Sequence, residues 1–282
     1  MNTVFLLVAA LFLVGNIRQT IYGWEGNKEI QWDLGGKIFL SLLCFLILHS
    51  AKCIRFYLVL MEQKIPFMRF LRLYLKTTFV NFLLPLKSGE LFRIYCFAHE
   101  TKNVQMGCIS VILDRVFDTC ILLLFLLPFD IFVAGKISVV TIVLSFIVLV
   151  VVAGCIFLYS SYGYLNKFLM INGNSRKTLF LLQTLENFKV CYDYMAKLLK
   201  GRFLLIFLFS CIGWGFEFLF LRLMAGILSI PFGIAEFADY ISGIFGAETG
   251  ILKNEYVLVS TVGLLVAMAI IYWLKNWRSK NV

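Results

Sequence analysis

The chain has 282 residues, of which 61% are hydrophobic, and its mean hydropathy is +0.90. Soluble domains contain about 45–50% apolar residues, so this composition excludes a soluble protein and predicts an integral membrane protein. The formal net charge of +10 would suit a nucleic-acid partner. Because the basic residues stand in short stretches beside apolar segments, where the positive-inside rule accounts for them, we expect no nucleic-acid partner.

Six apolar segments approach or exceed the roughly 20 residues that a membrane-spanning helix needs. They are residues 3–21, 38–58, 104–127, 137–159, 203–226 and 256–274. The first lacks the basic n-region and the small-residue cleavage site of a signal peptide, so we expect it to be retained as a helix. The pattern predicts an all-α, polytopic membrane protein in which residues 1–282 form one transmembrane domain.

Charged residues beside these segments predict the topology. The stretch that ends and follows segment 38–58 is strongly basic and contains one acid, Glu62. Its basic residues are Lys52, Arg55, Lys64, Arg69, Arg72 and Lys76. Because cytoplasmic loops carry the excess of lysine and arginine, we expect this stretch in the cytoplasm, and counting the crossings from it places both termini there.

A broken element follows between residues 67 and 100, where an apolar run ends at Pro85 and Gly89. Proline removes a helical N–H donor and glycine permits a chain reversal. We therefore expect a re-entrant hairpin that enters and leaves on the cytoplasmic side. If this element and a later broken stretch both crossed fully, the chain would have eight transmembrane helices rather than six, and the sequence leaves both counts open.

Polar residues gather around this break and in the apolar segment after it. They are Asn81, Glu90, Arg93, Asp114, Arg115 and Asp118. Ionisable residues inside membrane segments are costly and mark a functional site by default. We predict a substrate-binding site here, to which Glu217 of segment 203–226 and Glu248 of the later broken stretch also contribute.

Residues 160–202 form a basic linker between a first half, residues 1–159, and a second half, residues 203–282. Apolar residues recur in the linker at helical spacing from Leu182 to Leu199. This spacing predicts an amphipathic helix on the inner leaflet. Contact with anionic lipid and a plain surface linker both fit the pattern.

The second broken stretch, residues 231–253, is acidic, which suits the outer side of the membrane, and contains Gly243, Gly246 and Gly250. The two halves thus each carry one broken element, and the two elements enter from opposite sides. Such a pair is typical of an inverted-repeat transporter with its site near the midplane of the membrane. We predict an inverted repeat as a hypothesis that rests on this placement.

The residue types that bind metals or carry catalysis show no pattern typical of either. The eight cysteines are isolated and form no CxxC pair, so we expect small hydrophobic side chains rather than disulfides or metal ligands. His49 and His99 lie far apart without ligand spacing. Because no pair of a nucleophile and a base stands out either, we expect no metal, no cofactor and no enzymatic reaction.

Residues 81–118 resemble the signature of a known family. Asn81, Pro85, Gly89, Glu90 and Arg93 follow an N-x3-P-x3-G-[DE]-x2-R pattern, and the acidic-Arg-x-x-Asp sequence of residues 114–118 comes about twenty residues later. Both are similar to the lysylphosphatidylglycerol synthase/flippase transmembrane family. The likeness in topology extends over nearly the whole chain and includes the region after segment 38–58.

The second half departs from the family's pattern. Gly243, Gly246 and Glu248 resemble a family element, but no proline precedes them closely. An arginine expected in the last helix is missing between Tyr256 and Leu274. The soluble aminoacyltransferase domain of bifunctional members has no counterpart here, so we do not expect aminoacyl-lipid synthesis.

The resemblance implies movement of a lipid or lipid-linked headgroup between the leaflets of a prokaryotic plasma membrane, in cell-envelope lipid or glycan biogenesis. Anionic or polyprenyl-phosphate lipids are the expected partners. Arg93 and Arg115 can hold a phosphate, whereas the carboxylates Glu90, Asp114, Asp118 and Glu217 can hold an amine or a coupling proton.

Two alternatives stay open. The buried charges can simply pair and pin the helices together. The chain can also be a non-transporting membrane subunit that scaffolds a glycosyltransferase or another envelope-assembly enzyme through its basic linker. The sequence leaves the oligomeric state undetermined.

Overall fold

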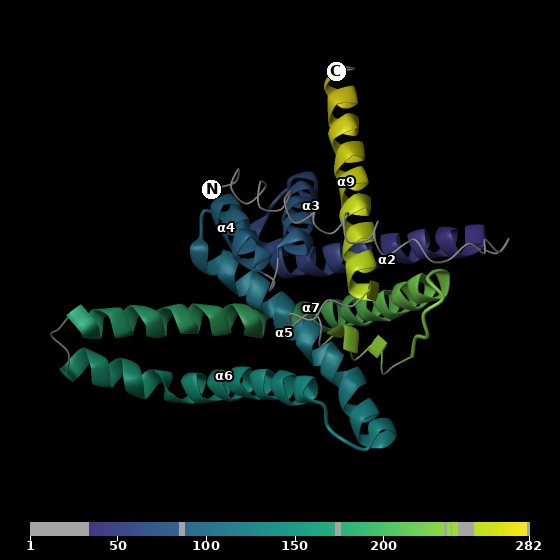
Figure 1. Cartoon of the computed structure of the whole chain (residues 1–282). Coiled ribbons are helices and arrows are strands. Elements are labelled where there is room, and N and C mark those ends of the chain that lie inside the picture. Colours follow the sequence, from purple (N-terminus) through teal and green to yellow (C-terminus); the bar gives the residue numbers. More distant parts are fainter. Residues whose placement is uncertain are drawn as a thin grey trace.

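The protein is described from a computed structural model, which covers residues 34–84, 88–172, 176–233, 236–237, 239–241 and 251–280 (Figure 1). The long elements of this part are all helices, and none of its residues is in a strand, so the predicted all-α class is confirmed. The helices are α2 (Leu34–Leu60), α3 (Phe67–Leu83), α4 (Gly89–Thr101), α5 (Val104–Phe129), α6 (Val139–Asn172), α7 (Arg176–Ile227) and α9 (Ile251–Lys280). The predicted first helix, residues 3–21, lies outside the described residues.

Within the described ranges, four helical segments are long and apolar enough to cross a membrane. They are Gly35–Gln63, Val139–Phe157, Gly201–Ile227 and Leu252–Trp273. Helix α5 has comparable length, 26 residues, but carries Asp114, Arg115 and Asp118 near its middle. The polytopic membrane architecture is therefore confirmed, and α5 combines the length of a membrane span with an internal group of charges.

Helix α2 packs along the second part of α7 and contributes one side to the core. Its buried side chains recur every three or four residues: Cys44, Leu48, Ala51, Arg55 and Val59. This spacing places them on a single helical face. Arg55 is thus part of the stripe that faces the core, whereas neighbours such as Phe39 and Leu42 face outward.

The predicted break between residues 67 and 100 separates two helices, α3 and α4, which pack against each other. They have 17 and 13 residues, each fewer than the roughly 20 that span a bilayer. Leu84 leaves α3 in an extended conformation, while Pro85 and Lys87 lie outside the described residues. A Cβ atom on Gly89 would overlap the backbone of Asn81, so only glycine lets α4 begin this close to α3.

Helices α4 and α5 are joined by a tight turn. Lys102 ends α4 in the left-handed conformation, with φ of 53°. The Asn103 side chain then accepts hydrogen bonds from the backbone N–H groups of Gln105 and Met106. This N-cap satisfies donors that the first turn of a helix leaves free, and it sets the direction of α5 against α4.

Another cap joins α5 to α6 at the opposite end of α5. The Asp130 carboxylate accepts a hydrogen bond of 2.8 Å from the Ser138 N–H at the start of α6. Burial raises the pKa of Asp130, but hydrogen bonds from Ser138 and Thr141 outweigh it and bring that pKa below the ordinary aspartate value. The carboxylate therefore remains an acceptor at neutral pH and holds the turn together.

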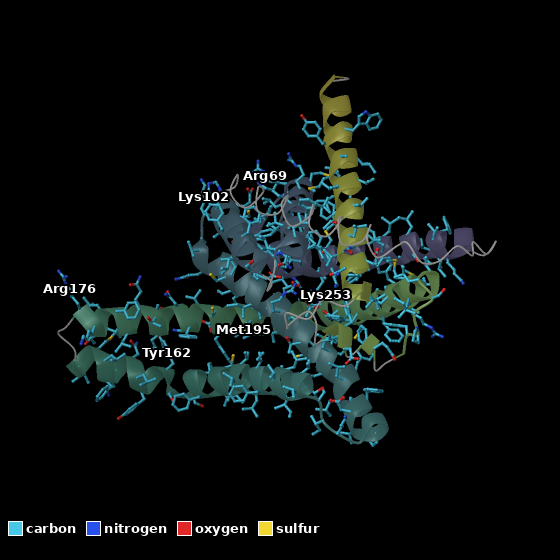
Figure 2. The ribbon with its side chains drawn as sticks, viewed as in Figure 1. Arg69, Lys102, Tyr162, Arg176, Met195 and Lys253 are labelled. Atoms are coloured by element: carbon cyan, nitrogen blue, oxygen red, sulfur yellow. The ribbon has the colours of Figure 1, made fainter. Side chains whose placement is uncertain are left out.

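Residues 182–199, where the linker is predicted to form an amphipathic helix, are helical and belong to a longer element. Residues up to Asn172 continue α6, and α7 runs without a break for 52 residues, about 78 Å at 1.5 Å per residue. The two helices form an antiparallel hairpin that projects beyond the other helices (Figure 1). Tyr159 and Tyr192 stack across it at 4.4 Å, and Figure 2 shows Tyr162 and Arg176 on its outer part.

The second broken stretch is described only in part. Helix α7 ends at Ile227, and Ser229 then adopts a left-handed conformation with φ of 56°. Residues 242–250, which include Gly243, Gly246 and Glu248, lie outside the described residues. The inverted repeat therefore stays a prediction.

Replacing Gly107 with alanine is expected to destabilise the protein. A Cβ atom there would lie 2.8 Å from the backbone nitrogen of Ala98, at the contact between α5 and α4. Overpacking of this kind costs about 1–3 kcal/mol. Thermal unfolding of the purified protein in detergent measures the effect. Gly154→Ala is the matched control, since nothing lies within 4 Å of its added Cβ, and equal melting of both variants would contradict the close packing of α4 on α5.

Candidate functional site

The centre of the candidate site is Arg55 of α2, whose side chain is 2% exposed. Its Nη2 lies 2.6 Å from Asp114 Oδ1, and its Nη1 donates a hydrogen bond to Asp118 Oδ1. The same Nη1 is 3.2 Å from the Ser210 hydroxyl. One guanidinium therefore ties α2 to α5 and α7, and Arg55 lies within a helix rather than in the loop that the basic stretch predicts.

On α5, Asp114 is shared by three arginines. Besides Arg55, its carboxylate contacts Arg115 Nη2 at 2.7 Å and Arg93 Nη1 at 3.7 Å. Asp118 lies one turn further along the same helix face and contacts Arg115 Nη1 at 3.2 Å. Both carboxylates are thus held by charge-assisted contacts, which are stronger than neutral hydrogen bonds.

The broken hairpin adds the remaining polar groups. Asn81 Nδ2 on α3 donates a 3.0 Å hydrogen bond to Glu90 Oε1 in the first turn of α4. Glu90 also lies 3.5 Å from Arg93 and 3.6 Å from Arg115. Arg93 Nη2 donates a 2.9 Å hydrogen bond back to the Thr78 hydroxyl. The two sides of the break are therefore joined to each other and to α5. We call Arg55, Arg93, Arg115, Glu90, Asp114 and Asp118 the charge network.

A second polar group lies beside the charge network. Lys52 Nζ is 2.5 Å from Glu217 Oε2, and the Tyr240 hydroxyl donates a 3.1 Å hydrogen bond to the other oxygen of Glu217. Trp214 connects the two groups: its ring lies 5.1 Å from the Lys52 ammonium, and its Nε1 donates a 3.0 Å hydrogen bond to Asp118. We call Lys52, Glu217 and Tyr240 the Glu217 site.

These contacts join four cations to four carboxylates, so the formal charges cancel. The cations are Lys52, Arg55, Arg93 and Arg115, and the carboxylates are Glu90, Asp114, Asp118 and Glu217. Buried ions are tolerated only when paired and hydrogen-bonded, and this pairing explains how α5 keeps its charges inside the helix packing.

The charge network is not equally buried on all sides. The Arg115 side chain is 34% exposed and that of Glu90 14%, whereas the side chains of Arg55 and Asp114 are each 2% exposed. An incoming ligand would therefore meet Arg115 and Glu90 first. Atoms without a hydrogen-bond partner among the described residues occur on both sides of the charge network, among them Glu90 Oε2 and Arg115 Nε on the exposed side and Arg55 Nε and Asp114 Oδ1 on the buried side.

Metal-binding groups are absent from the described part of the chain, which contains no cluster of three or more histidine, cysteine, aspartate or glutamate side chains able to hold an ion. All eight cysteines are free thiols. The chemistry available in the described residues is thus that of guanidinium, ammonium, carboxylate and hydroxyl groups.

The predicted site residues fall into three sets. Six of them come together around the charge network: Asn81, Glu90, Arg93, Asp114, Arg115 and Asp118. Glu217 lies one step away, across Lys52 and Trp214, and Glu248 lies outside the described residues. Their binding roles stay predictions.

Sequence reasoning missed Lys52, Arg55, Trp214 and Tyr240. For Arg55 a signal was present, because it continues the three-to-four-residue spacing of apolar positions in segment 38–58. Trp214 and Tyr240 carry no such signal, since a tryptophan or tyrosine is ordinary in an apolar segment.

A protein-family model described as the lysylphosphatidylglycerol synthase TM region matches residues 3–247 of the chain. No curated protein and no solved structure matches the chain significantly. The match covers the charge network, the Glu217 site and the projecting hairpin.

Proposed function

Because the chain belongs to the lysylphosphatidylglycerol synthase TM family, we propose that it moves an anionic lipid, or a lipid-linked headgroup, between the leaflets of a prokaryotic plasma membrane. The process is conformational and involves no covalent chemistry. The observation that carries the proposal is the charge network, in which three guanidinium groups stand at the junction of α2, α5 and a broken hairpin, with one of them partly exposed.

A phosphate group is the ligand that this arrangement fits best. Guanidinium matches two phosphate oxygens at once, and Arg115 is the accessible guanidinium of the charge network. Arg93 lies behind it on α4, and both share Glu90 and Asp114 as partners. A phosphate that reached Arg115 would thus meet a second cation within the same set of contacts.

Binding also gives a reason for movement. Each arginine of the charge network is already paired, so a phosphate that binds Arg115 competes with Glu90, whose contact now joins α4 to α5. Loss of the Arg115 contact with Glu90 would weaken the attachment of α4 to α5. A ligand that interacts differently with the two arrangements shifts their populations, which is the requirement for alternating access.

A second candidate function rests on a different surface. The tip of the α6–α7 hairpin exposes Met170, Ile171, Leu179 and Phe180 beside the exposed Arg176. Exposed apolar side chains within a basic stretch are typical of a contact with another molecule. Under this alternative the chain is a non-transporting subunit, and the hairpin holds a glycosyltransferase or another envelope-assembly enzyme in the cytoplasm.

Reconstitution in liposomes tests the first function. We expect the wild type to exchange fluorescent phospholipids or a polyprenyl-phosphate lipid between leaflets, and Arg115→Ala and Glu90→Gln to slow the exchange about tenfold, the effect of losing a contact of about 1.4 kcal/mol. Fluorescence loss on adding an external quencher follows the exchange. Arg176→Ala is the matched control, because its side chain lies on the hairpin, away from the charge network.

The outcomes separate the alternatives. Exchange that depends on Arg115 and Glu90 but not on Arg176 supports a flippase. If the wild type moves neither lipid, the flippase proposal fails for those lipids. If both network variants fold and match an active wild type, the buried charges pin the helices together and do not bind the substrate.

A further inference from the structure

Glu217 differs from the other carboxylates that the contacts join. Asp114 faces three arginines, Asp118 faces two, and Glu90 lies near two. Arginine does not release its proton in proteins, so these carboxylates keep cationic partners at any physiological pH. The cation that Glu217 contacts among the described ion pairs is Lys52, whose side chain is 20% exposed.

The surroundings of Glu217 are largely aromatic. Helix α2 carries His49 one turn before Lys52. On α5, Asp118 accepts a hydrogen bond from Trp214. Helix α9 contributes Tyr256, whose ring lies 5.6 Å from that of Tyr240. The 139–157 segment of α6 contains no charged residue. The charged residues nearby in the sequence, Asp239, Lys253 and Glu255, also take part in interactions.

Polar side chains continue from this place along α9 and α2. Tyr256 lies within reach of Glu217, Tyr240 and Ser260, and the buried His49 has no hydrogen-bond partner among the described residues. Tyr256 and Ser260 are one turn apart on α9, and the Phe82 ring lies between Tyr256 and His49, at 5.7 and 5.9 Å. Buried donors and acceptors without a partner need an explanation, and groups that bind or pass a proton provide one.

The charge count links a proton at Glu217 to an anion at Arg115. With Glu217 ionised, the four cations and four carboxylates cancel, so the buried groups hold no net charge for an anion. One proton on Glu217 removes one negative charge and leaves a net charge of about +1 in a low-dielectric interior, where an unpaired charge is costly. A phosphodiester monoanion restores neutrality.

We propose that Glu217 is a proton-binding site coupled to the phosphate site, so that the protein takes up one proton with each anionic headgroup. This inference rests on the proposed function for the identity of the anion. The proton comes from bulk water and binds a Glu217 oxygen. Lys52 then loses its ion-pair partner and turns past Trp214 toward Asp118. A contact between Lys52 and Asp118 weakens the ion pair of Asp118 with Arg115, so that Arg115 can bind the phosphate. Release of the headgroup returns Lys52 to Glu217 and expels the proton.

Calorimetry on the full chain in an uncharged detergent measures this coupling directly. The probe is dihexanoyl phosphatidylglycerol, titrated at one pH in two buffers with different ionisation enthalpies. We expect an uptake of about one proton per bound lipid, and an affinity that falls about tenfold for each unit rise in pH, as linkage to one proton requires. Dimethyl phosphate separates a free phosphodiester from a lipid headgroup, and dihexanoyl phosphatidylcholine, which is zwitterionic, should bind without uptake.

Two variants and a control make the assignment specific. Glu217→Gln mimics the protonated state and should bind the probe tightly, with no proton uptake and no pH dependence. Lys52→Met removes one cation. With Glu217 protonated, the three arginines then balance the three remaining carboxylates, so the site is neutral before the lipid binds. Binding of the lipid should weaken, and proton uptake on binding should disappear. Glu62→Gln is the control with wild-type behaviour, since Glu62 forms its own ion pair with Lys197 at 3.4 Å.

Three results overturn the inference: dihexanoyl phosphatidylglycerol binds without proton uptake, neither dihexanoyl phosphatidylglycerol nor dimethyl phosphate binds, or uptake survives in both Glu217→Gln and Lys52→Met. Failure of the flippase function looks different. If the probe binds with uptake of one proton but lipids do not exchange in liposomes, the coupled site stands and the transport function falls. If lipids exchange but binding takes up no proton, the reverse holds.

Discussion

Replacing Arg55 with methionine is expected to destabilise the protein by about 3–5 kcal/mol, the range seen when one partner of a buried ion pair is removed. Methionine fills much of the same space, so the loss is electrostatic rather than a cavity. Asp114 and Asp118 would lose a shared cation in a region where their side chains are 2% and 9% exposed. The contact between α2 and α5 should loosen, and we expect early melting and poor expression.

Thermal unfolding in detergent measures this effect, with Arg69→Met as the matched control. Arg69 pairs with Glu100 at 3.1 Å, but its side chain is 61% exposed, and exposed pairs contribute about 0–1 kcal/mol. Arg69 lies at the outer side of α3 (Figure 2). Similar melting of both variants would mean that Arg55 is not the centre of the charge network.

Arg55 shows why the site could be predicted only in part. The sequence of segment 38–58 ends in a basic stretch, and the positive-inside rule assigns lysine and arginine near a helix end to the loop. Whether such a residue turns inward depends on the helix face it occupies and on a carboxylate across the interface. Asp118 is 63 residues away from Arg55 in the sequence, and no local sequence pattern predicts a contact between residues so far apart.

Residues on neighbouring turns were easier to predict. Asp114, Arg115 and Asp118 are adjacent on one helix, so their common location follows from helical periodicity. Asn81 and Glu90 lie on the two sides of a helix break that Pro85 and Gly89 predict. The net charge of the site could not be derived in this way, because it depends on which cations of α2 join it, and Lys52 and Arg55 were both assigned to a loop.

The fold shows the same contrast. The helices of the described part agree with the apolar segments, since length and hydropathy are local properties. The end of a helix is decided by whether a breaking residue stops it. No proline occurs between Arg176 and Ile227, so the helix predicted for the linker continues straight into the next apolar segment.

Replacing Asp114 with alanine is expected to have the largest effect on transport. Asp114 contacts Arg55, Arg93 and Arg115, so its loss leaves three guanidinium groups facing Glu90 and Asp118 alone. The uncompensated cation should hold a phosphate permanently, and release should then limit the cycle. We expect lipid exchange to fall at least a hundredfold, about 3 kcal/mol, which lies within the range for a lost buried charge partner.

Binding and exchange measured on the same preparation distinguish this effect from misfolding. Asp114→Ala should bind dihexanoyl phosphatidylglycerol more tightly than the wild type while exchanging lipids more slowly, a combination that an unfolded protein cannot give. Asp130→Ala is the matched control: it removes a buried aspartate that caps α6 outside the charge network, and the loss of such a cap costs about 1 kcal/mol. Exchange by Asp130→Ala should match the wild type.

Weaker binding in folded Asp114→Ala would contradict this account. It would mean that Asp114 holds the arginines in position for the phosphate rather than competing with it. The affinity for the phosphate would then depend on how Asp114 positions the arginines and not on the net charge of the site. Because the two mechanisms predict opposite changes in affinity for the same substitution, one titration separates them.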